Sequence, residues 1–225
     1  SCSQRAQHPP QRNGTRCRHD NAWVTLVVPM TLNQPILNRL ATHADLPGIL
    51  RLQDANLRDN LTEEQQAQGF VTTPFTTAQL EQLIALTGLY VADQGGQIQG
   101  YTMSAGWDYF AQWPIFPFMI ERLQRRQLFG TAITASNSFQ YGPVCVAASL
   151  RGTGTFPRLF EAMRLDLAAR FPVGITFINR TNRLSYGAHT KTLGMTVVEQ
   201  FEFMDREYWA LAFDTSRSVL KRTPT

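Results

Sequence analysis

The stretch FQYGPVCVAASLRGTGTFPRLFEAM, residues 139–163, decides the fold of this chain. It begins with an apolar run, residues 139–148, which predicts a buried strand. A polar, glycine-rich loop follows at residues 149–155, and a helical pattern starts directly after it. Gly152 and Gly154 let the loop backbone pass close to a ligand, and the new helix presents unpaired N–H groups at its positive end. This order of strand, loop and helix predicts an anion site, most often one for a phosphate.

Length and charge bound the class of protein. The chain has 225 residues, of which 43% are hydrophobic, and this suffices for one domain with a full core. Four arginines precede the first acidic residue, Asp20, and removing them from the 21 basic residues leaves 17, equal to the 17 acidic residues. The body is therefore neutral, and we expect no nucleic-acid partner. DNA binding through a basic arm within residues 1–29 is a third and weaker hypothesis.

Cysteine usage and hydropathy indicate a cytoplasmic protein. Cys2, Cys17 and Cys145 are odd in number and have no metal-type spacing, which favours a reducing compartment without structural disulfides. We expect no metal site. No apolar run approaches the roughly 18 to 20 residues of a membrane span, and the first residues lack an apolar signal segment, so no membrane association is predicted.

The residue patterns divide the chain into three parts. Residues 1–29 predict a disordered or extended tail, residues 30–215 a single domain, and residues 216–225 a frayed C-terminal tail. The elements expected within the domain are a strand at 36–40, a helix capped by Ala44 or Asp45, a helix at 62–68, a helix capped by Thr76 or Thr77, a hairpin of 89–92 and 98–104, the central strand, loop and helix, a strand at 174–178, a helix from Thr181 or Asn182 that Gly194 ends, and a hairpin of 196–203 and 208–213.

Residues 107–118 concentrate six aromatic side chains, and Pro114 and Pro117 are expected to keep this stretch irregular. Two interpretations are open: packing beneath a loop, or an aromatic wall for a substrate or partner. Exposed aromatics here would indicate a homodimer.

The loop RGTGTF, residues 151–156, and the order of the expected elements resemble the GNAT family, the acyl-CoA-dependent N-acetyltransferases. The resemblance covers about residues 37–214. The family's pyrophosphate loop has the form R/Q-x-x-G-x-G/A, which this chain matches except at Phe156, where the family usually keeps Gly or Ala. The alternative is an ordinary tight turn between a strand and a helix.

A second motif, NRTNRLSYGAHTKTLGMTVV at residues 179–198, resembles a later segment of the same family. Asn182, Ser185, His189 and Gly194 supply the expected residue types, with one extra residue before the glycine. The resemblance implies an α/β fold with a mixed, mostly antiparallel sheet flanked by helices. It also implies a bulged, splayed central strand, and Gly142-Pro143 is suited to such a bulge because proline cannot donate to the ladder.

By resemblance, the protein is an acetyltransferase that moves an acetyl group from acetyl-CoA to a primary amine by direct attack. Val144 to Val146 would pair with the pantetheine amides, and the amides of the glycine-rich loop would hold the pyrophosphate. The cofactor-binding residues so implied are Val144, Cys145, Val146, Arg151, Gly152, Thr153, Gly154, Thr155, Asn182 and Ser185. The partners implied are acetyl-CoA and an amine acceptor.

Catalytic roles follow from the needs of acyl transfer. The N–H of Val144 is the candidate oxyanion donor, His189 the candidate general acid, and Tyr186 its substitute if the extra residue shifts the register. The expected strand carries no carboxylate, so the base is Asp108, Glu121 or a water. A second hypothesis is a GNAT-fold module that binds an acyl-CoA or an aromatic ligand without catalysis, because Phe156 would crowd the pantetheine arm unless it turns into the core.

Overall fold

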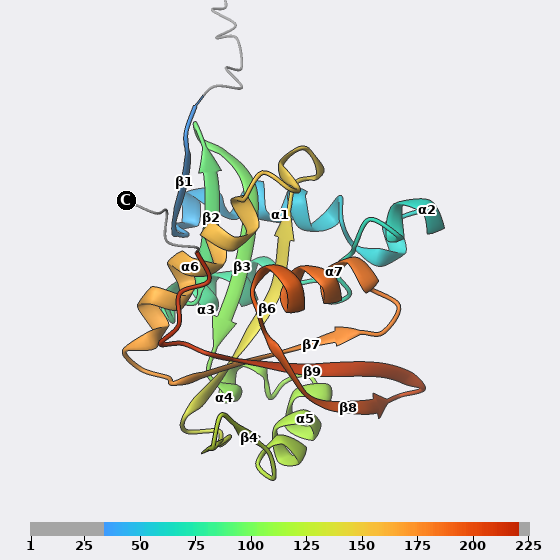
Figure 1. Cartoon of the computed structure of the whole chain (residues 1–225). Coiled ribbons are helices and arrows are strands. Elements are labelled where there is room, and N and C mark those ends of the chain that lie inside the picture. The colour runs from blue at the N-terminus through green and yellow to red at the C-terminus, as the bar shows by residue number, and fades with distance from the viewer. Residues whose placement is uncertain (1–33, 221–225) are drawn as a thin grey trace, which may run out of the picture. The chain divides into compact units, whose positions relative to one another are not determined.

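A seven-stranded sheet forms the centre of the computed structural model, which describes residues 34–220 (Figure 1). The strand order is β1-β2-β3-β6-β7-β9-β8, in which β6 and β7 are parallel and the other neighbours antiparallel. A separate small hairpin joins β4 to β5. The strands are β1 (Ile36–Leu40), β2 (Leu89–Gln94), β3 (Gln97–Ala105), β4 (Gln127–Leu128), β5 (Thr131–Ala132), β6 (Ser138–Val146), β7 (Val173–Asn179), β8 (Thr196–Phe203) and β9 (Arg206–Asp214).

Helices cover both faces of this sheet. On one face Ile49 of α1 and Leu80 of α3 belong to one apolar core, and on the other Leu159 and Phe160 of α6 belong to a second. Figure 1 shows α6 and α7 on the same side of the sheet. The helices are α1 (Leu46–Asp54), α2 (Glu63–Gln66), α3 (Thr77–Ala85), α4 (Trp107–Phe110), α5 (Ile115–Leu123), α6 (Thr155–Ala168) and α7 (Arg183–Gly187), which a π-helix, η4 (Ala188–Thr192), continues; short 3-10 turns are η1 (His43–Asp45), η2 (Arg58–Asn60) and η3 (Ala148–Leu150).

The expected helix starts are confirmed by their caps. Asp45 is the N-cap of α1, which carries Pro47 in its first turn, where the missing N–H has no helical partner to lose. Thr76 caps α3, because its Oγ1 accepts a hydrogen bond from the N–H of Gln79. In return the N–H of Thr76 donates to Oε1 of Gln79. Side-chain capping therefore fixes where α3 begins, whereas α1 begins at Asp45 without a side-chain cap bond.

Both predicted hairpins are present. Gly95 and Gly96 connect β2 to β3 with φ of +62° and +85°. Met204 and Asp205 connect β8 to β9 with φ of +47° and +58°. Two consecutive residues with positive φ give the turn whose twist matches that of the flanking strands.

The aromatic stretch differs from its prediction, because it forms two helices, α4 and α5. Pro114 is the N-cap of α5 and Pro117 lies in its first turn, where neither proline removes a helical hydrogen bond. Trp107, Phe110 and Phe116 are buried in the core on the α1 face. The prolines thus set where the helix starts and do not prevent it.

The predictions for residues 1–29 concern a segment outside the described range. The C-terminal tail predicted from residue 216 is described as far as residue 220, and there the N–H of Val219 donates to Oε2 of Glu161 at 3.2 Å. Glu161 and Arg164 form a buried ion pair of 2.7 Å on α6. Within residues 34–220, no helix has the length and apolar character needed to cross a membrane.

Candidate active site

The central strand β6 carries a bulge opposite β3. Thr102 pairs with Val144 and Ser104 with Tyr141, so β6 has one residue more than β3 over this interval. The extra residue falls at Gly142-Pro143, where the glycine has φ of +101°, a conformation that side chains disfavour. The bulge predicted for this dipeptide is confirmed.

Beyond the bulge, β6 separates from its parallel neighbour β7. The two strands pair from Ser138 to Gln140, which lies opposite Ile175, while β7 continues to Asn179 beside β9. Their divergence is visible in Figure 1. The predicted splay is therefore present, and two cavities lie along it.

The larger cavity, of about 380 Å³, lies over the second half of β6 and the glycine-rich loop. Gly152 and Gly154 line it with φ of +79° and +86°, and Gly154 is the N-cap of α6. The positive end of this helix therefore opens beside the cavity. Its other lining residues include Asn56, Gln68, Phe70, Val144, Cys145, Val146, Arg151, Phe156, Asn182, Ser185 and His189.

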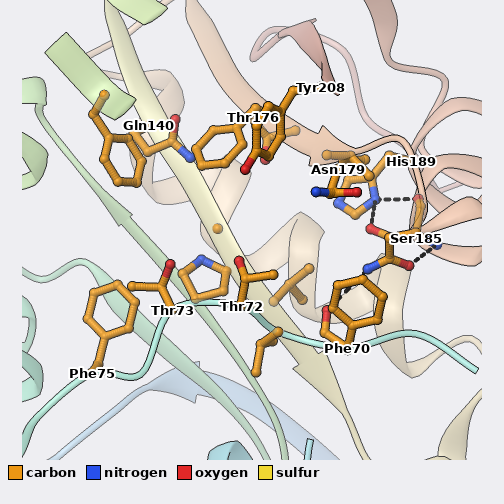
Figure 2. A pocket seen from close by; sticks show the side chains of 18 residues that line it. Phe70, Thr72, Thr73, Phe75, Gln140, Thr176, Asn179, Ser185, His189 and Tyr208 are labelled. Carbon is orange, nitrogen blue, oxygen red and sulfur yellow. Dashed lines mark hydrogen bonds between the residues drawn. The ribbon is translucent and has the colours of Figure 1, made fainter. Parts of the chain in front are cut away.

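The smaller cavity, of about 100 Å³, lies on the other side of the bulge. Figure 2 shows Phe70, Thr72 and Thr73 along one wall, and Gln140, Thr176 and Tyr208 along the opposite wall. The segment before α3, the helix α5 and the strands β6, β7 and β9 all contribute side chains. No Asp, Glu, Lys or Arg is among the described residues that line it.

The two cavities share one wall. The residues that line both are Phe70, Val71, Val144, Asn182, Ser185 and His189. A group bound in one cavity would thus meet a group bound in the other at this wall.

His189 is held in one tautomer by its own helix. Its Nδ1 lies 2.7 Å from the carbonyl oxygen of Ser185, which can only accept, so Nδ1 carries the proton. The ring is 3% exposed and packs against Tyr141 and Phe156. Burial lowers the pKa of His189 to about 4, so the imidazole is neutral near pH 7 and the lone pair lies on Nε2.

Two predicted cofactor residues hold the shared wall in place. Arg151 donates from Nη1 to the carbonyl of Gln68 at 2.6 Å and from Nη2 to Oδ1 of Asn56 at 3.1 Å. Asn182 caps α7 and donates from Nδ2 to the carbonyl of Phe70 at 3.1 Å. The glycine-rich loop and α7 are therefore both bonded to the segment that separates the cavities.

Comparison of the structure with solved structures reveals the same arrangement elsewhere. An N-acetyltransferase from Staphylococcus aureus Mu50 superposes with a TM-score of 0.53 at 16% identity, over 80% of this chain and 99% of that one. The structure of yncA from Salmonella typhimurium with its cofactor acetyl-CoA superposes with a TM-score of 0.53 at 16% identity, over 80% of this chain and 94% of that one. A ribosomal-protein-alanine N-acetyltransferase from Brucella melitensis superposes with a TM-score of 0.52 at 18% identity, over 79% of this chain and 99% of that one.

The chain has the GNAT N-acetyltransferase fold. No protein-family model and no curated protein matches the sequence. Within this fold the bulge lies in the central strand β6, and the glycine-rich loop leads directly into α6.

Not every predicted residue reaches the cavities of this GNAT fold. Tyr186 packs on Trp209 with ring centroids 4.0 Å apart and lines neither cavity. The extra residue before Gly194 is taken up by the π-helix η4, in which the N–H of Leu193 bonds to the carbonyl of Ala188. His189 therefore lines both cavities, whereas Tyr186 lines neither.

Other predicted residues stand apart from the cavity walls. Thr153 and Thr155 bond to each other through their hydroxyls at 2.9 Å, and neither side chain lines a cavity. Asp108 is exposed on α4, and Glu121 is exposed on α5 beside a different cavity. Neither carboxylate is in a position to act as the base.

Phe156 and Cys145 each have a defined environment. The ring of Phe156 is half-buried, stands edge-on to His189 at 5.3 Å and lines the larger cavity, so it both packs on the core and narrows the cleft. Burial raises the pKa of Cys145 to about 12, which keeps it a thiol at neutral pH.

Sequence reasoning missed three contributors. Arg158 places Nη1 3.5 Å from the carbonyl of Thr153, over the glycine-rich loop, and its place in the first turn of α6 was a usable signal. Phe70 and Gln140 reach the cavities from segments whose positions depend on the whole fold. Among residues 34–220, no three His, Cys, Asp or Glu side chains are grouped to hold a metal.

Proposed function

We propose that this protein transfers an acetyl group from acetyl-CoA to a primary amine by direct attack in a ternary complex. The observation that carries the proposal is the shared wall, where Val144 and His189 line both cavities. A thioester in the larger cavity would there face an amine in the smaller one, and such placement alone lowers the barrier substantially. Direct transfer needs no covalent protein intermediate, which agrees with the buried thiol of Cys145.

The residues of the larger cavity fit an acyl-CoA. A side-chain atom added at Gly152 would meet nothing within 4 Å, so the loop backbone is open to an approaching phosphate. The loop leads into α6, a helix of 14 residues whose positive end favours anions, and the guanidinium of Arg158 lies over the same loop. When bound there, acetyl-CoA would supply an activated thioester.

Each cofactor-binding residue has a proposed task. Val144, Cys145 and Val146 would border the pantetheine arm, and the amides from Arg151 to Thr155 would hold the pyrophosphate. Asn182 and Ser185 would close the wall on the α7 side. The guanidinium of Arg151 is committed to Gln68 and Asn56, so its role is to position the wall while its backbone faces the cavity.

Val144 is the proposed oxyanion donor. Its residue follows the bulge directly and lines both cavities, which places its backbone at the meeting point of thioester and amine. A fixed backbone N–H that faces developing negative charge is worth about 3 kcal/mol in comparable sites.

His189 is proposed to accept a proton and not to donate one. With Nδ1–H bonded to the carbonyl of Ser185, the neutral ring offers only a lone pair at Nε2. That atom can take the proton of the attacking amine. The leaving thiolate needs little help from an acid, because thiols ionise near pH 8.5.

Two measurements on the whole chain test the proposal. Calorimetric titration with acetyl-CoA should give binding in the micromolar range, and a free-thiol release assay with a panel of primary amines should give turnover. Absence of binding at millimolar acetyl-CoA would contradict the proposal at its first step.

A second candidate function is that of a GNAT-fold module without catalytic activity. Such a module would bind an acyl-CoA, or an aromatic ligand, in the larger cavity. It is favoured by Phe156, whose ring narrows the cleft, and by the absence of a carboxylate among the described residues that line the smaller cavity. Acetyl-CoA binding without thiol release from any amine would select this alternative.

A further inference from the structure

We infer that the smaller cavity selects a short primary amine whose tail is uncharged and ends in a hydrogen-bond donor that Gln140 binds. This inference rests on the proposed acetyltransferase function and names the substrate class of that site. Four observations carry it: the neutral lining, the small volume, the position of Gln140 at the closed end of the splay, and an amide oxygen without a partner.

The lining of the smaller cavity excludes a charged tail. Of the described residues that form it, His189 and Tyr208 are titratable, and Phe75, Phe116 and Phe177 supply apolar walls. A carboxylate or a second ammonium bound there would lose its water and gain no opposite charge. Burying an unpaired ion costs several kcal/mol, so such acceptors are disfavoured.

The volume sets the size of the tail. A cavity of about 150 Å³ holds benzene, and this one measures about 100 Å³. It therefore accommodates about four non-hydrogen atoms beyond the reacting nitrogen.

Gln140 supplies a specific contact for the end of the tail. It is 2% exposed, and Nε2 donates to the carbonyl of Tyr141 at 2.7 Å, which fixes the orientation of the amide. Its Oε1 is buried without a hydrogen-bond partner among residues 34–220. A buried acceptor left unpaired is destabilising, and a ligand O–H or N–H would remove that cost.

The position of Gln140 assigns it to the tail of the acceptor. It is the last residue at which β6 pairs with β7, so it stands at the closed end of the splay. Val144, at the shared wall, is four residues further along the strand. The amine thus reacts at Val144 and His189 while the far end of its tail points toward Gln140.

The test is a series of amines whose main chains have the same length and four different ends. The acceptors are 3-aminopropan-1-ol, butylamine, 1,3-diaminopropane and 3-aminopropanoate, each assayed by thiol release on the whole chain. We expect the alcohol to have the highest kcat/KM, butylamine to be about tenfold lower, and both charged acceptors at least about 100-fold lower. A charged acceptor used as well as the alcohol would overturn the inference.

Two substitutions separate the role of Gln140 from general damage. Gln140→Leu removes the acceptor oxygen, so alcohol and butylamine should become equal. Gln140→Glu adds a carboxylate of the same shape and should shift preference toward 1,3-diaminopropane by about tenfold or more. An unchanged order in both variants would overturn the assignment of Gln140, and the wild-type series decides the tail class even if a variant fails to fold.

The outcomes also separate this inference from the proposed function. Turnover with a different order of acceptors would contradict the inferred substrate class but would still support the proposed acetyltransferase function. Turnover of other primary amines in the wider panel but of none of these four also removes only the substrate class, whereas binding of acetyl-CoA without turnover of any amine in that panel counts against the acetyltransferase itself.

Discussion

The two cavities that meet at the bulge of β6 are built by different means. The larger one has one wall that runs along the chain from Val144 through the loop to the start of α6, where amides and a helix end would favour an anion. The smaller one is made of side chains from six separate elements and a loop. The first kind of site is encoded locally and depends on glycine, whereas the second depends on the tertiary fold and on the chemistry of each side chain.

His189 lines both cavities, so its replacement should have the largest effect on activity. His189→Phe keeps an aromatic ring against Tyr141 and Phe156 but removes the lone pair at Nε2. We expect kcat to fall by about 100-fold or more while the Kd of acetyl-CoA changes less than threefold. The exposed His43, changed to Gln, is the matched control and should keep full activity.

The same residue predicts a pH dependence of stability. Its pKa is about 4 in the folded state against an ordinary value of 6.5, so between these pH values the unfolded chain binds a proton that the folded chain does not. Stability should therefore fall as the pH drops from 6.5 to 4, by about 3 kcal/mol. Urea unfolding at several pH values should give this loss in the wild type and not in His189→Phe. Parallel curves for the two proteins would show that His189 is not buried as a neutral base.

A matched pair of glycines tests whether the larger cavity is a backbone site. Gly152 and Gly130 have φ of +79° and +82°, and an added side-chain atom would meet nothing within 4 Å at either position. Changing either to Ala should cost about 1 kcal/mol of stability. Only Gly152→Ala should weaken the binding of acetyl-CoA, by about tenfold, and the KM of the amine should stay unchanged. Equal binding by both variants in calorimetry would remove the loop from the site.

The smallest effect is expected at Phe156, whose ring lines the larger cavity and not the smaller one. Phe156→Ala removes a half-buried ring from the core, so the free energy of unfolding should fall by about 1–2 kcal/mol. It also widens the cleft, and acetyl-CoA should bind about threefold more tightly. Weaker binding would mean that the ring contacts the pantetheine arm favourably, and calorimetry decides between the two.

The difference between the cavities also explains what the sequence could predict. The bulge at Gly142-Pro143 and the loop at Gly152 and Gly154 were predicted because proline and glycine impose their conformations locally. The candidate role of His189 was implied by the resemblance of residues 179–198 to a segment of the GNAT family. The resemblance to a family with this fold supplied the order of the strands, which local patterns alone do not give.

The smaller cavity could not be predicted in the same way. Phe70 and Gln140 face each other across segments that are distant in the sequence, and no spacing rule connects them. The protonation of His189 was also beyond the sequence, because it depends on burial and on the carbonyl of Ser185. The helices α4 and α5 were missed because a proline at a helix start resembles a proline that breaks one.

The π-helix η4 shows how this chain tolerates a change of length. One residue inserted into a regular α-helix rotates everything after it by about 100°. Here the wide turn between Ala188 and Leu193 takes up the extra residue, so that Leu193 and Met195 still pack in the core while Asn182 and His189 stay on the cavity side. The number of residues between a motif before this turn and one after it can consequently vary. A sequence alignment without a gap at this turn would assign the wrong residue to the site.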